Sequence, residues 1–186
     1  MNLILFGPPG VGKGTQASLL AASHSLLHIS TGDILRKAIA DGSSLGVIAR
    51  TYVESGGLVP DDIIIGLVRE VLESLDAESG FLLDGFPRTL EQAHALDDLF
   101  RELGIDDVSI VMIAAPEKEL IDRMVKRGLE QGRKDDTAET IRHRLDVYTK
   151  QTEPVKAYYD KTRGVKLVDG LGSVEEVTGR IEKELV

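Results

Sequence analysis

The sequence predicts an α/β fold in which a central parallel β-sheet is flanked by helices. Three observations predict it. Short apolar runs alternate along the chain with longer amphipathic stretches, which is the pattern of repeated βαβ units. The apolar runs are continuous or nearly so, as expected for strands covered on both faces. No repeat, low-complexity stretch or linker divides the 186 residues, and a chain of this length is expected to form one domain.

The apolar runs are the expected strands, and the amphipathic stretches between them are the expected helices. Strands are expected at Leu3–Phe6, Leu27–Ile29, Phe81–Leu83, Val108–Ile113 and Val165–Val168. Helices are expected at 12–23, 31–41, 61–75, 89–102, 117–127, 137–159 and 173–185. Pro154 lies inside the 137–159 pattern. Because proline lacks the amide donor that a helix interior needs, it should kink that helix or end it near Glu153.

Two segments do not fit a minimal βαβ rhythm. Residues 30–59 hold two helical patterns, which are broken by Gly42 and by the pair Gly56 and Gly57. Residues 128–136 form a short polar stretch that begins with a glycine and lies between two helical patterns. Both segments are expected to leave the core, and long excursions of this kind are often functional.

Composition excludes several classes of function. The chain has 22 Lys and Arg against 31 Asp and Glu, a net charge of −9, which argues against nucleic acid as a partner but leaves room for a small phosphate site. It has no Cys, so disulfides, thiolate zinc sites and Cys nucleophiles are excluded. The apolar run near the N-terminus is too short for a signal peptide or a membrane span. A cytoplasmic protein without a membrane partner is expected.

The strongest motif is Gly7–Thr15 (GPPGVGKGT), which follows the first apolar run and opens the first helical pattern. Strand, glycine-rich turn and helix form the context of a phosphate-binding loop. Glycines let backbone N–H groups converge on anionic oxygens, and the helix N-terminus adds further donors. Lys13 can reach the terminal phosphates as a mobile charge. Gly14 stands where Ser or Thr is usual and Thr15 follows it, so a hydroxyl ligand for magnesium is not assured.

A second motif follows the apolar run at 81–83. Asp84 and Arg88 come where a strand should end, and ligands of open α/β sheets bind at that edge. Asp84 is therefore placed to orient Mg²⁺, through water, while Arg88 can present a planar fork of donors to a phosphate. Gln92 would share a helix face with Arg88 and can offer a base edge both a donor and an acceptor. The alternative for Arg88 is an exposed arginine at the start of a helix.

Arginines are concentrated in one part of this acidic chain. Five of its twelve arginines fall within residues 123–144. Arg123 and Arg127 are four residues apart and lie off the apolar stripe of their expected helix, so they share a polar face. Each one alone could be a surface residue, since Glu119 can pair with Arg123 across one helical turn.

These motifs resemble, in order and over essentially the whole chain, those of the nucleoside monophosphate kinases. Gly7–Gln16, including its Gly-Lys-Gly-Thr variant, and Phe81–Thr89 resemble the two signatures of that family, and Ser30–Arg36 resembles the acceptor segment of adenylate kinases. The short bacterial form is the most similar. The resemblance implies a P-loop three-layer fold, a single kinase domain over 1–186, with a helical AMP-binding excursion at 30–59 and a short lid at 127–136. The absence of Cys excludes a zinc lid.

The activity that the resemblance implies is reversible transfer from MgATP to AMP, giving two ADP. ATP, AMP and ADP would be the small-molecule partners, Mg²⁺ the cofactor, and the protein a monomer. The acceptor phosphate is already ionised at neutral pH, so positioning and charge neutralisation would replace a general base. A UMP/CMP kinase or a shikimate-type kinase stays open, although Thr31 and Gln92 favour adenine. A nucleotide-binding module without turnover also stays open, although the number of arginines argues against it.

The resemblance also implies roles for individual residues. For ATP it implies Gly10, Val11, Gly12, Lys13, Gly14, Thr15, Arg123, Arg127 and Gly172. For AMP it implies Thr31, Arg36, Gly57, Leu58, Val59, Gly85, Phe86, Pro87, Arg88, Gln92, Arg133 and Arg144. The catalytic residues around the transferred group would be Lys13, Arg88, Arg127, Arg133 and Arg144, with Asp84 on Mg²⁺ through water. Asp135 and Asp136 match acids that pair with basic partners when the lid closes. Many members have Lys in place of Gly172.

Overall fold

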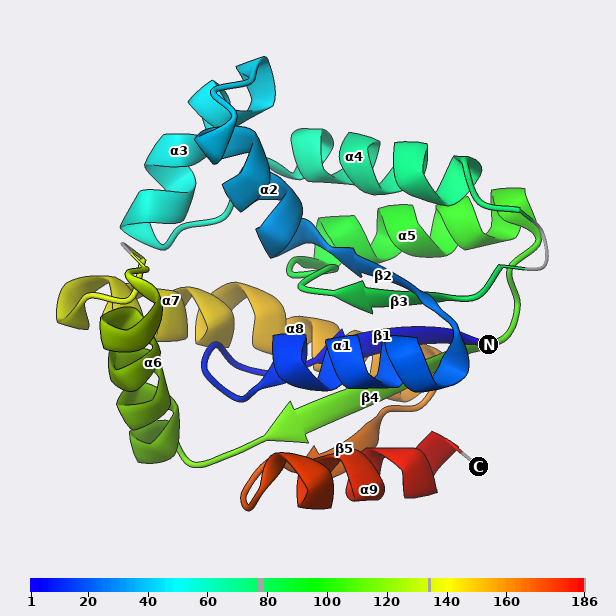
Figure 1. Ribbon diagram of the computed structural model, residues 1–186. Helices are drawn as coiled ribbons and strands as arrows, with labels where there is room; N and C mark the ends of the chain where they lie inside the picture. Colours follow the sequence, from blue (N-terminus) through cyan, green and yellow to red (C-terminus); the bar gives the residue numbers. More distant parts are fainter. Residues whose placement is uncertain (77–78, 134, 186) are drawn as a thin grey trace.

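A computed structural model describes residues 1–76, 79–133 and 135–185 of the protein. Its centre is a parallel five-stranded sheet in the order β2-β3-β1-β4-β5 (Figure 1). The strands are β1 (Asn2–Phe6), β2 (Leu27–Ser30), β3 (Phe81–Asp84), β4 (Val108–Ala114) and β5 (Lys166–Asp169). The predicted sheet is confirmed. All the carboxyl ends meet at one edge, and β1, in the middle, separates crossovers that run in opposite directions, so the binding crevice of such a sheet lies there.

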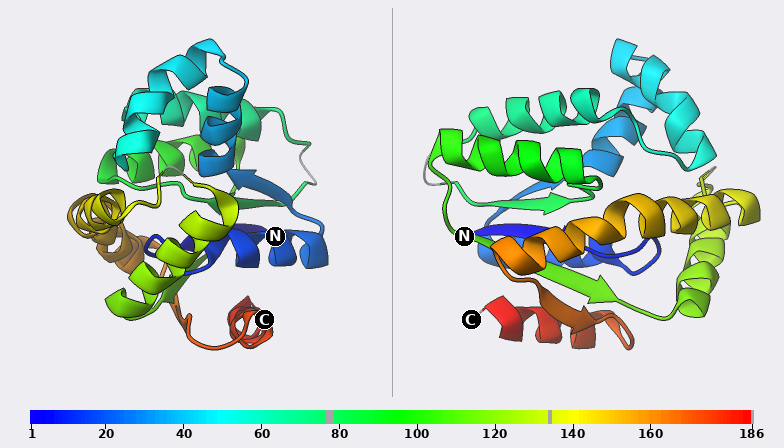
Figure 2. Two further views of the ribbon diagram at one scale, coloured as in Figure 1. Left: turned by 60° about the vertical axis from the view of Figure 1, so that its left-hand side comes forward. Right: turned by 180° about the vertical axis from the view of Figure 1, so that it is seen from behind.

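Helices connect the strands and cover both faces of the sheet. They are α1 (Lys13–His24), α2 (Thr31–Ala40), α3 (Ser44–Ser55), α4 (Asp61–Glu73), α5 (Leu90–Leu103), α6 (Glu117–Gln131), α7 (Ala138–Val147), the π-helical turn η1 (Tyr148–Thr152), α8 (Glu153–Thr162) and α9 (Val174–Leu185). Helices α4, α5 and α8 lie on one face of the sheet, and α1 and α9 lie on the other (Figures 1 and 2). This is the predicted three-layer arrangement.

The alternation of side chains along β1 divides the apolar interior into two cores. Ile4 and Phe6 pack with residues of α4, α5 and α8, among them Tyr159, which is fully buried. Leu3 and Leu5 point to the opposite face and pack with residues of α1, α6 and α9. Successive strand residues are thus buried on both sides, which explains why the run at 3–6 is continuously apolar.

The excursion at 30–59 consists of α2 and α3, which pack on each other beyond the sheet (Figure 1). Both helices begin at a serine cap. Ser30 accepts a hydrogen bond from the Asp33 amide at 3.3 Å, and Ser43 accepts one from the Gly46 amide at 3.1 Å, as preferred at helix N-termini. A Cβ on Gly46 would collide with the Ala38 carbonyl, so the close contact of the two helices requires glycine there.

Helix α6 is longer than predicted. The predicted boundary at residue 127 is wrong, since α6 runs on through Gly128 to Gln131 and ends at Gly132, where φ is +61°. Gly128 does not break the helix; a Cβ there would lie 3.0 Å from the Asp136 carbonyl oxygen, so the glycine permits a close approach. Residues 132–137 alone join α6 to α7, and residue 134 lies outside the described residues.

The helix expected at 137–159 consists of three segments, because the π-helical turn η1 separates α7 from α8. Pro154 lies in the first turn of α8, where its missing N–H has no intrahelical partner to lose. The interruption near Glu153 is therefore confirmed. None of the described helices is both long enough and apolar enough to cross a membrane.

Candidate functional site

The glycine-rich loop between β1 and α1 is held tightly against β4 and α6. A Cβ on Gly7 would lie 2.5 Å from the Ile113 carbonyl oxygen, and one on Gly10 would lie 2.7 Å from that of Leu120. Gly10 and Gly12 adopt φ values of +85° and +100°, which favour glycine. Gly12 precedes α1 and no side chain among the described residues caps that helix, so the first N–H groups of α1 can serve an anion.

Lys13 folds back over this loop. Its Nζ donates to the carbonyl oxygens of Gly7, at 2.7 Å, and Pro8, at 2.9 Å. Burial lowers the pKa of Lys13 to about 7; Asp84 opposes this shift, and neighbouring arginines such as Arg88 add to it. An anion arriving at the loop would restore the full charge of the ammonium group.

Asp84 ends β3 beside β1 and β2, in register with Leu5 and Ser30. A Cβ on Gly14 would lie 3.7 Å from Asp84 Oδ2, so the carboxylate is close to the start of α1. His28 Nε2, which has no hydrogen-bond partner among the described residues, lies 3.8 Å from the same oxygen. Within the described ranges no three His, Cys, Asp or Glu side chains could hold a metal by themselves. Asp84 fits Mg²⁺, which keeps waters and substrate phosphates as ligands.

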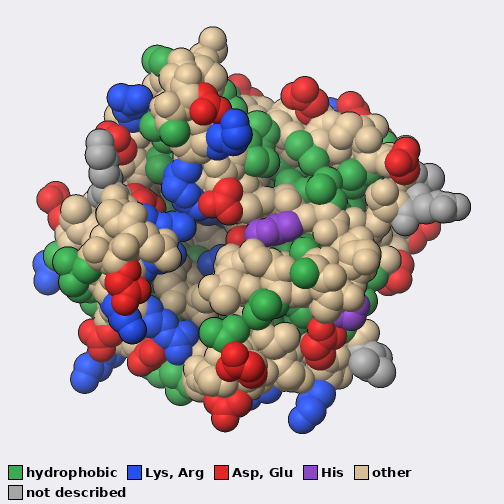
Figure 3. Space-filling model, in the orientation of Figure 1, with side chains coloured by type: hydrophobic (Ala, Val, Ile, Leu, Met, Phe, Trp, Pro, Cys, Tyr) green, Lys and Arg blue, Asp and Glu red, His purple; other side chains and the backbone are tan. Residues whose placement is uncertain are grey.

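One cavity opens between the glycine-rich loop, α2, α3 and the segment that follows β3. Of the residues predicted for AMP, all but Arg133 line it, namely Thr31, Arg36, Gly57, Leu58, Val59, Gly85, Phe86, Pro87, Arg88, Gln92 and Arg144. Lys13 lines it as well. Figure 3 shows Lys and Arg side chains gathered around a hollow in this face. The structure thus brings the phosphate loop and the predicted acceptor segment to one space.

The sequence did not predict some of the cavity walls. Leu35, Val53 and Ile64 add apolar surface from α2, α3 and α4, and Tyr148 and Thr152 come from η1. The amphipathic patterns of these segments were visible, but periodicity alone does not distinguish a wall that faces a ligand from one that faces the core. The apolar lining suits a planar ring, and polar groups at its ends can orient that ring.

The Arg88 side chain is held by a backbone carbonyl, and its own backbone carbonyl is held by η1. Its Nε donates to the Gly85 carbonyl at 2.7 Å, and Thr152 Oγ1 donates to the Arg88 carbonyl at 2.9 Å. In the part of the chain that the structure describes, no carboxylate forms an ion pair with Arg88. Burial lowers the pKa of Arg88, Asp84 opposes the shift and Arg36 adds to it. A partly buried cation without a paired carboxylate is suited to bind an anion.

Gln92 is oriented by three neighbours. Its Oε1 accepts from the Arg88 amide at 2.7 Å, and its Nε2 donates to Asp61 Oδ1 at 2.7 Å. Thr89 Oγ1 donates to the other oxygen of Asp61 at 2.7 Å and accepts from the Gln92 amide at 3.1 Å. Sequence reasoning missed Asp61. The Thr89-x-x-Gln92 spacing, which is that of a capping box, signalled that the Gln92 side chain turns back toward the helix start.

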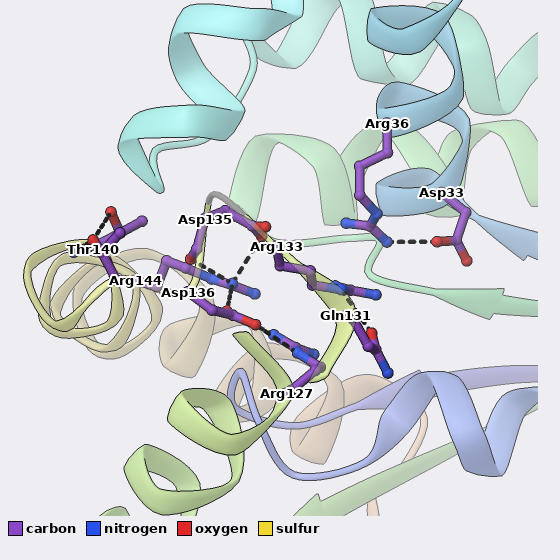
Figure 4. Close-up of polar contacts among 10 residues, drawn as sticks. Asp33, Arg36, Arg127, Gln131, Arg133, Asp135, Asp136, Thr140 and Arg144 are labelled. Carbon is purple, nitrogen blue, oxygen red and sulfur yellow. Dashed lines mark hydrogen bonds and ion pairs between the residues drawn. The ribbon is translucent and has the colours of Figure 1, made fainter. Parts of the chain in front are cut away.

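Arg127 and Arg144 are tied to two aspartates of the α6–α7 connection (Figure 4). Arg127 Nε and Nη2 donate to Asp136 at 2.7 and 2.8 Å. Arg144 Nη1 donates to Asp136 at 2.7 Å and to Asp135 Oδ2 at 2.9 Å. The Asp136 side chain is fully buried. Burial lowers the pKa of Arg144, and the two aspartates oppose that shift. Both acids thus pair with arginines of α6 and α7; that such pairing accompanies closure of the lid stays a prediction.

The remaining predicted arginines lie around the rim. Arg36 pairs with Asp33 at 2.5 Å, and Arg133 donates to Gln131 Oε1 at 3.1 Å, outside the cavity lining (Figure 4). Arg123 pairs with Glu119 at 2.7 Å, and its Nη1 donates to the Gly170 carbonyl at 3.1 Å. Arg123 therefore also connects α6 to the turn between β5 and α9, near the loop.

The residues predicted for ATP alone surround the glycine-rich loop rather than line the cavity. Gly10, Val11 and Gly12 form the loop, Gly14 and Thr15 begin α1, Arg123 and Arg127 lie on α6, and Gly172 precedes α9. Gly172 has φ +106°, and a Cβ there would collide with the Glu176 carboxylate. Glycine therefore suits this turn, which leaves its backbone to make any contact with a ligand.

Comparison with known proteins decides the family. The adenylate kinase family model matches residues 5–164. The chain belongs to the adenylate kinase family. It is 44% identical to the adenylate kinase of Leptospira biflexa over 184 residues, which cover 99% of each chain. It is 49% identical to that of Thermus thermophilus over 183 residues (98% of this chain and 96% of the relative). It is 46% identical to that of Thermobifida fusca over 180 residues (97% and 95%). The resemblance drawn from the motifs is confirmed.

Proposed function

We propose that the protein transfers the γ-phosphoryl group of MgATP reversibly to AMP, giving two ADP. One observation carries the proposal. Lys13 and Arg88 line a single cavity, and neither forms an ion pair with a carboxylate in the described ranges. The same cavity offers apolar walls and the carboxamide of Gln92. Unpaired cations beside a pocket for a planar base suit a nucleotide whose phosphate meets a second phosphate at the loop.

On the donor side, the glycine-rich loop receives the phosphates of ATP. The amides at the start of α1 donate to them, and Lys13 leaves the Gly7 and Pro8 carbonyls to follow the transferred group. Arg123 and Arg127 reach the donor from α6, with Arg123 beside the base and Arg127 on the phosphates. The backbone at Gly172 touches the adenine. Membership of the family and the positions of these residues around the loop support these roles.

On the acceptor side, AMP occupies the cavity. Leu58 and Val59 pack on the base, Gln92 bonds its edge, and Arg36 and Arg88 hold the α-phosphate. Thr31, the first residue of α2, donates its Oγ1 to the Gly85 carbonyl at 3.0 Å and so ties α2 to the segment after β3. Gly57 and residues 85–87 supply close backbone contacts.

The chemistry requires charge neutralisation and exclusion of water more than proton transfer. The AMP phosphate oxygen is already ionised at neutral pH, so it attacks without a base. Lys13, Arg88, Arg127, Arg133 and Arg144 surround the transferred group and stabilise its charge. Asp84 would hold a Mg²⁺ ion through water, and that ion would supply further positive charge to the donor phosphates. Closure of the AMP-binding excursion at 30–59 and of the short lid at 127–136 excludes water, which is itself an acceptor.

The proposal includes the setting in which the protein acts. We place it in the cytoplasm as a monomer whose partners are ATP, AMP and ADP, with neither nucleic acid nor a membrane bound. The net charge of −9 supports the absence of nucleic acid and membrane partners, because polyanions and anionic membrane surfaces repel such a chain. Light scattering on the purified protein measures the mass in solution, and a dimer would contradict this part of the proposal.

A coupled assay for ADP tests the activity. With ATP, Mg²⁺ and AMP we expect ADP at two moles per mole of AMP consumed, and we expect at least about tenfold lower kcat/KM with CMP or UMP. Shikimate should not be phosphorylated. Faster turnover with CMP or UMP would make the protein a pyrimidine nucleotide kinase. Binding of ATP and AMP without ADP formation would leave it a binding module.

A further inference from the structure

The contacts of Gln92 determine which end of its side-chain amide is the oxygen and which is the nitrogen. Its Oε1 accepts a hydrogen bond from the backbone N–H of Arg88, and its Nε2 donates one to Asp61 Oδ1, each at 2.7 Å. A rotation of the amide by 180° would set Nε2 against a donor and Oε1 against a carboxylate. Both contacts would then be repulsive, so only one orientation of the amide satisfies its neighbours.

Asp61 is itself held in place. It occupies the first position of α4, and its second oxygen accepts from Thr89 Oγ1 at 2.7 Å. An ionised carboxylate has acceptors only, so Asp61 cannot turn to donate toward Gln92. The Arg88 amide, on the opposite side of Gln92, can only donate. We call these two contacts of the Gln92 amide the lock. The contact with Asp61 depends on a side chain that substitution can change, and the contact with Arg88 depends on the backbone.

The lock determines what Gln92 offers to the cavity. Gln92 is nearly fully buried and lines the cavity. After its bonds to Arg88 and Asp61, one N–H of Nε2 and one lone pair of Oε1 remain. A 6-aminopurine presents an acceptor at N1 and a donor at its amino group, which match this pair. A 6-oxopurine presents a donor at N1 and an acceptor at O6. This order is reversed, and it matches Gln92 only if the amide is rotated by 180°.

We propose that Asp61 is a positioning residue that fixes the Gln92 carboxamide and so makes the acceptor site select a 6-aminopurine nucleotide over a 6-oxopurine nucleotide. This inference rests on the proposed function, because it concerns the acceptor of that reaction. Asp61 acts through Gln92 and is absent from the residues that line the cavity. A bidentate contact of this kind discriminates between bases by about fivefold to 150-fold.

The test compares Asp61→Asn with the wild type, using AMP and inosine 5′-monophosphate as acceptors. The amide of the new Asn side chain has the same shape as the carboxylate, but it can either accept from Gln92 Nε2 or donate to Gln92 Oε1. The contact at residue 61 then no longer selects one orientation of Gln92. We expect the ratio of kcat/KM for AMP to that for inosine monophosphate to fall at least about fivefold. The KM for ATP should not change. Where turnover with inosine monophosphate is too slow to measure, its inhibition constant against AMP replaces kcat/KM.

Asp62→Asn is the matched control, since Asp62 is the exposed neighbour of Asp61 in the same first turn of α4. It removes the same charge and should leave the ratio within twofold of the wild type. A merely structural role for Asp61 would lower kcat/KM for both acceptors alike, and an unchanged ratio in Asp61→Asn would overturn the inference. Asp61→Ser, whose hydroxyl can also donate or accept, makes the same test if the first variant does not fold. Failure of the proposed function is distinguishable, because the wild type would then form no ADP from AMP.

Discussion

Replacing Asp136 by Asn should destabilise the nucleotide-free protein and leave the nucleotide-bound protein much less affected. Asp136 is fully buried and accepts two hydrogen bonds from Arg127 and one from Arg144. The amide of Asn keeps the size of the side chain but loses its charge. It also has one acceptor oxygen in place of two. The two guanidinium groups would then remain at the site without the anion that they share.

The magnitude follows from these contacts. Breaking a buried ion pair by removing one partner costs about 3–5 kcal/mol. Arg127 and Arg144 keep 27% and 18% of their side chains exposed, so water solvates part of the charge and about 2–3 kcal/mol is the reasonable loss. At about 2–4 °C per kcal/mol for a domain of this size, Tm should fall by about 4–12 °C.

Thermal unfolding with and without a bisubstrate mimic, two adenosines joined by a chain of phosphates, measures the effect. The phosphates supply the missing negative charge, so the mimic should raise the Tm of Asp136→Asn by several degrees more than that of the wild type. Asp146→Asn is the control, because Asp146 pairs with Lys150 at the surface, with both side chains more than half exposed. Its Tm should change by no more than about 1 °C. A Tm for Asp136→Asn within 1 °C of the wild type would refute the reasoning, and so would an equal response of both proteins to the mimic.

Three further predictions concern the reaction itself. Arg88→Ala should lower kcat by about 10²–10⁴, and Arg88→Lys should restore only part of the loss because it lacks the planar fork; a loss below threefold in steady-state assays would remove Arg88 from the site. Because the pKa of Lys13 is about 7 in the empty site, its amine is mostly neutral at pH 8, and an arriving phosphate should recharge it. Calorimetry in buffers of different ionisation enthalpy should therefore show proton uptake on ATP binding at pH 8 and little at pH 6; the absence of uptake at pH 8 would contradict this. EDTA should abolish turnover and Mg²⁺ restore it, while the Tm of the nucleotide-free protein stays within about 1 °C; a larger fall would reveal a structural metal.

The sequence predicted those parts of the site that depend on local chain geometry. The loop before Lys13 follows a strand and opens a helix, so its position was fixed by neighbouring residues alone. Asp84 and Arg88 come at the end of an apolar run, and a parallel sheet places that end beside the glycine-rich loop. Most of the residues predicted for AMP also line one cavity, but those were implied by the family resemblance rather than by local geometry. The arrangement of the sheet followed from the alternation of apolar runs and helical patterns.

The sequence could not predict contacts between side chains far apart in the chain. Asp61 and Gln92 begin different helices, and nothing local shows that they meet. Likewise, the spacing of Arg127 and Arg144 does not show that Asp136 lies between them. The π-helical turn at 148–152 has no signal of its own, and nothing local shows that α6 continues past Gly128 to Gln131. In each case the tertiary packing overrides or completes what local propensity indicates.

The pairing of Asp135 and Asp136 with the arginines has a consequence for product release. A polyphosphate bound to these guanidinium groups would dissociate slowly if nothing replaced it, because its departure would leave the groups without an anion and poorly solvated. Here two carboxylates, attached to the same chain and always at high local concentration, can replace each departing phosphate. Release of a phosphate is thus an exchange in which an aspartate carboxylate takes its place on the arginines. For the reaction proposed above, the two aspartates are therefore expected to compete with the phosphates of ADP for Arg127 and Arg144, and so to speed its release.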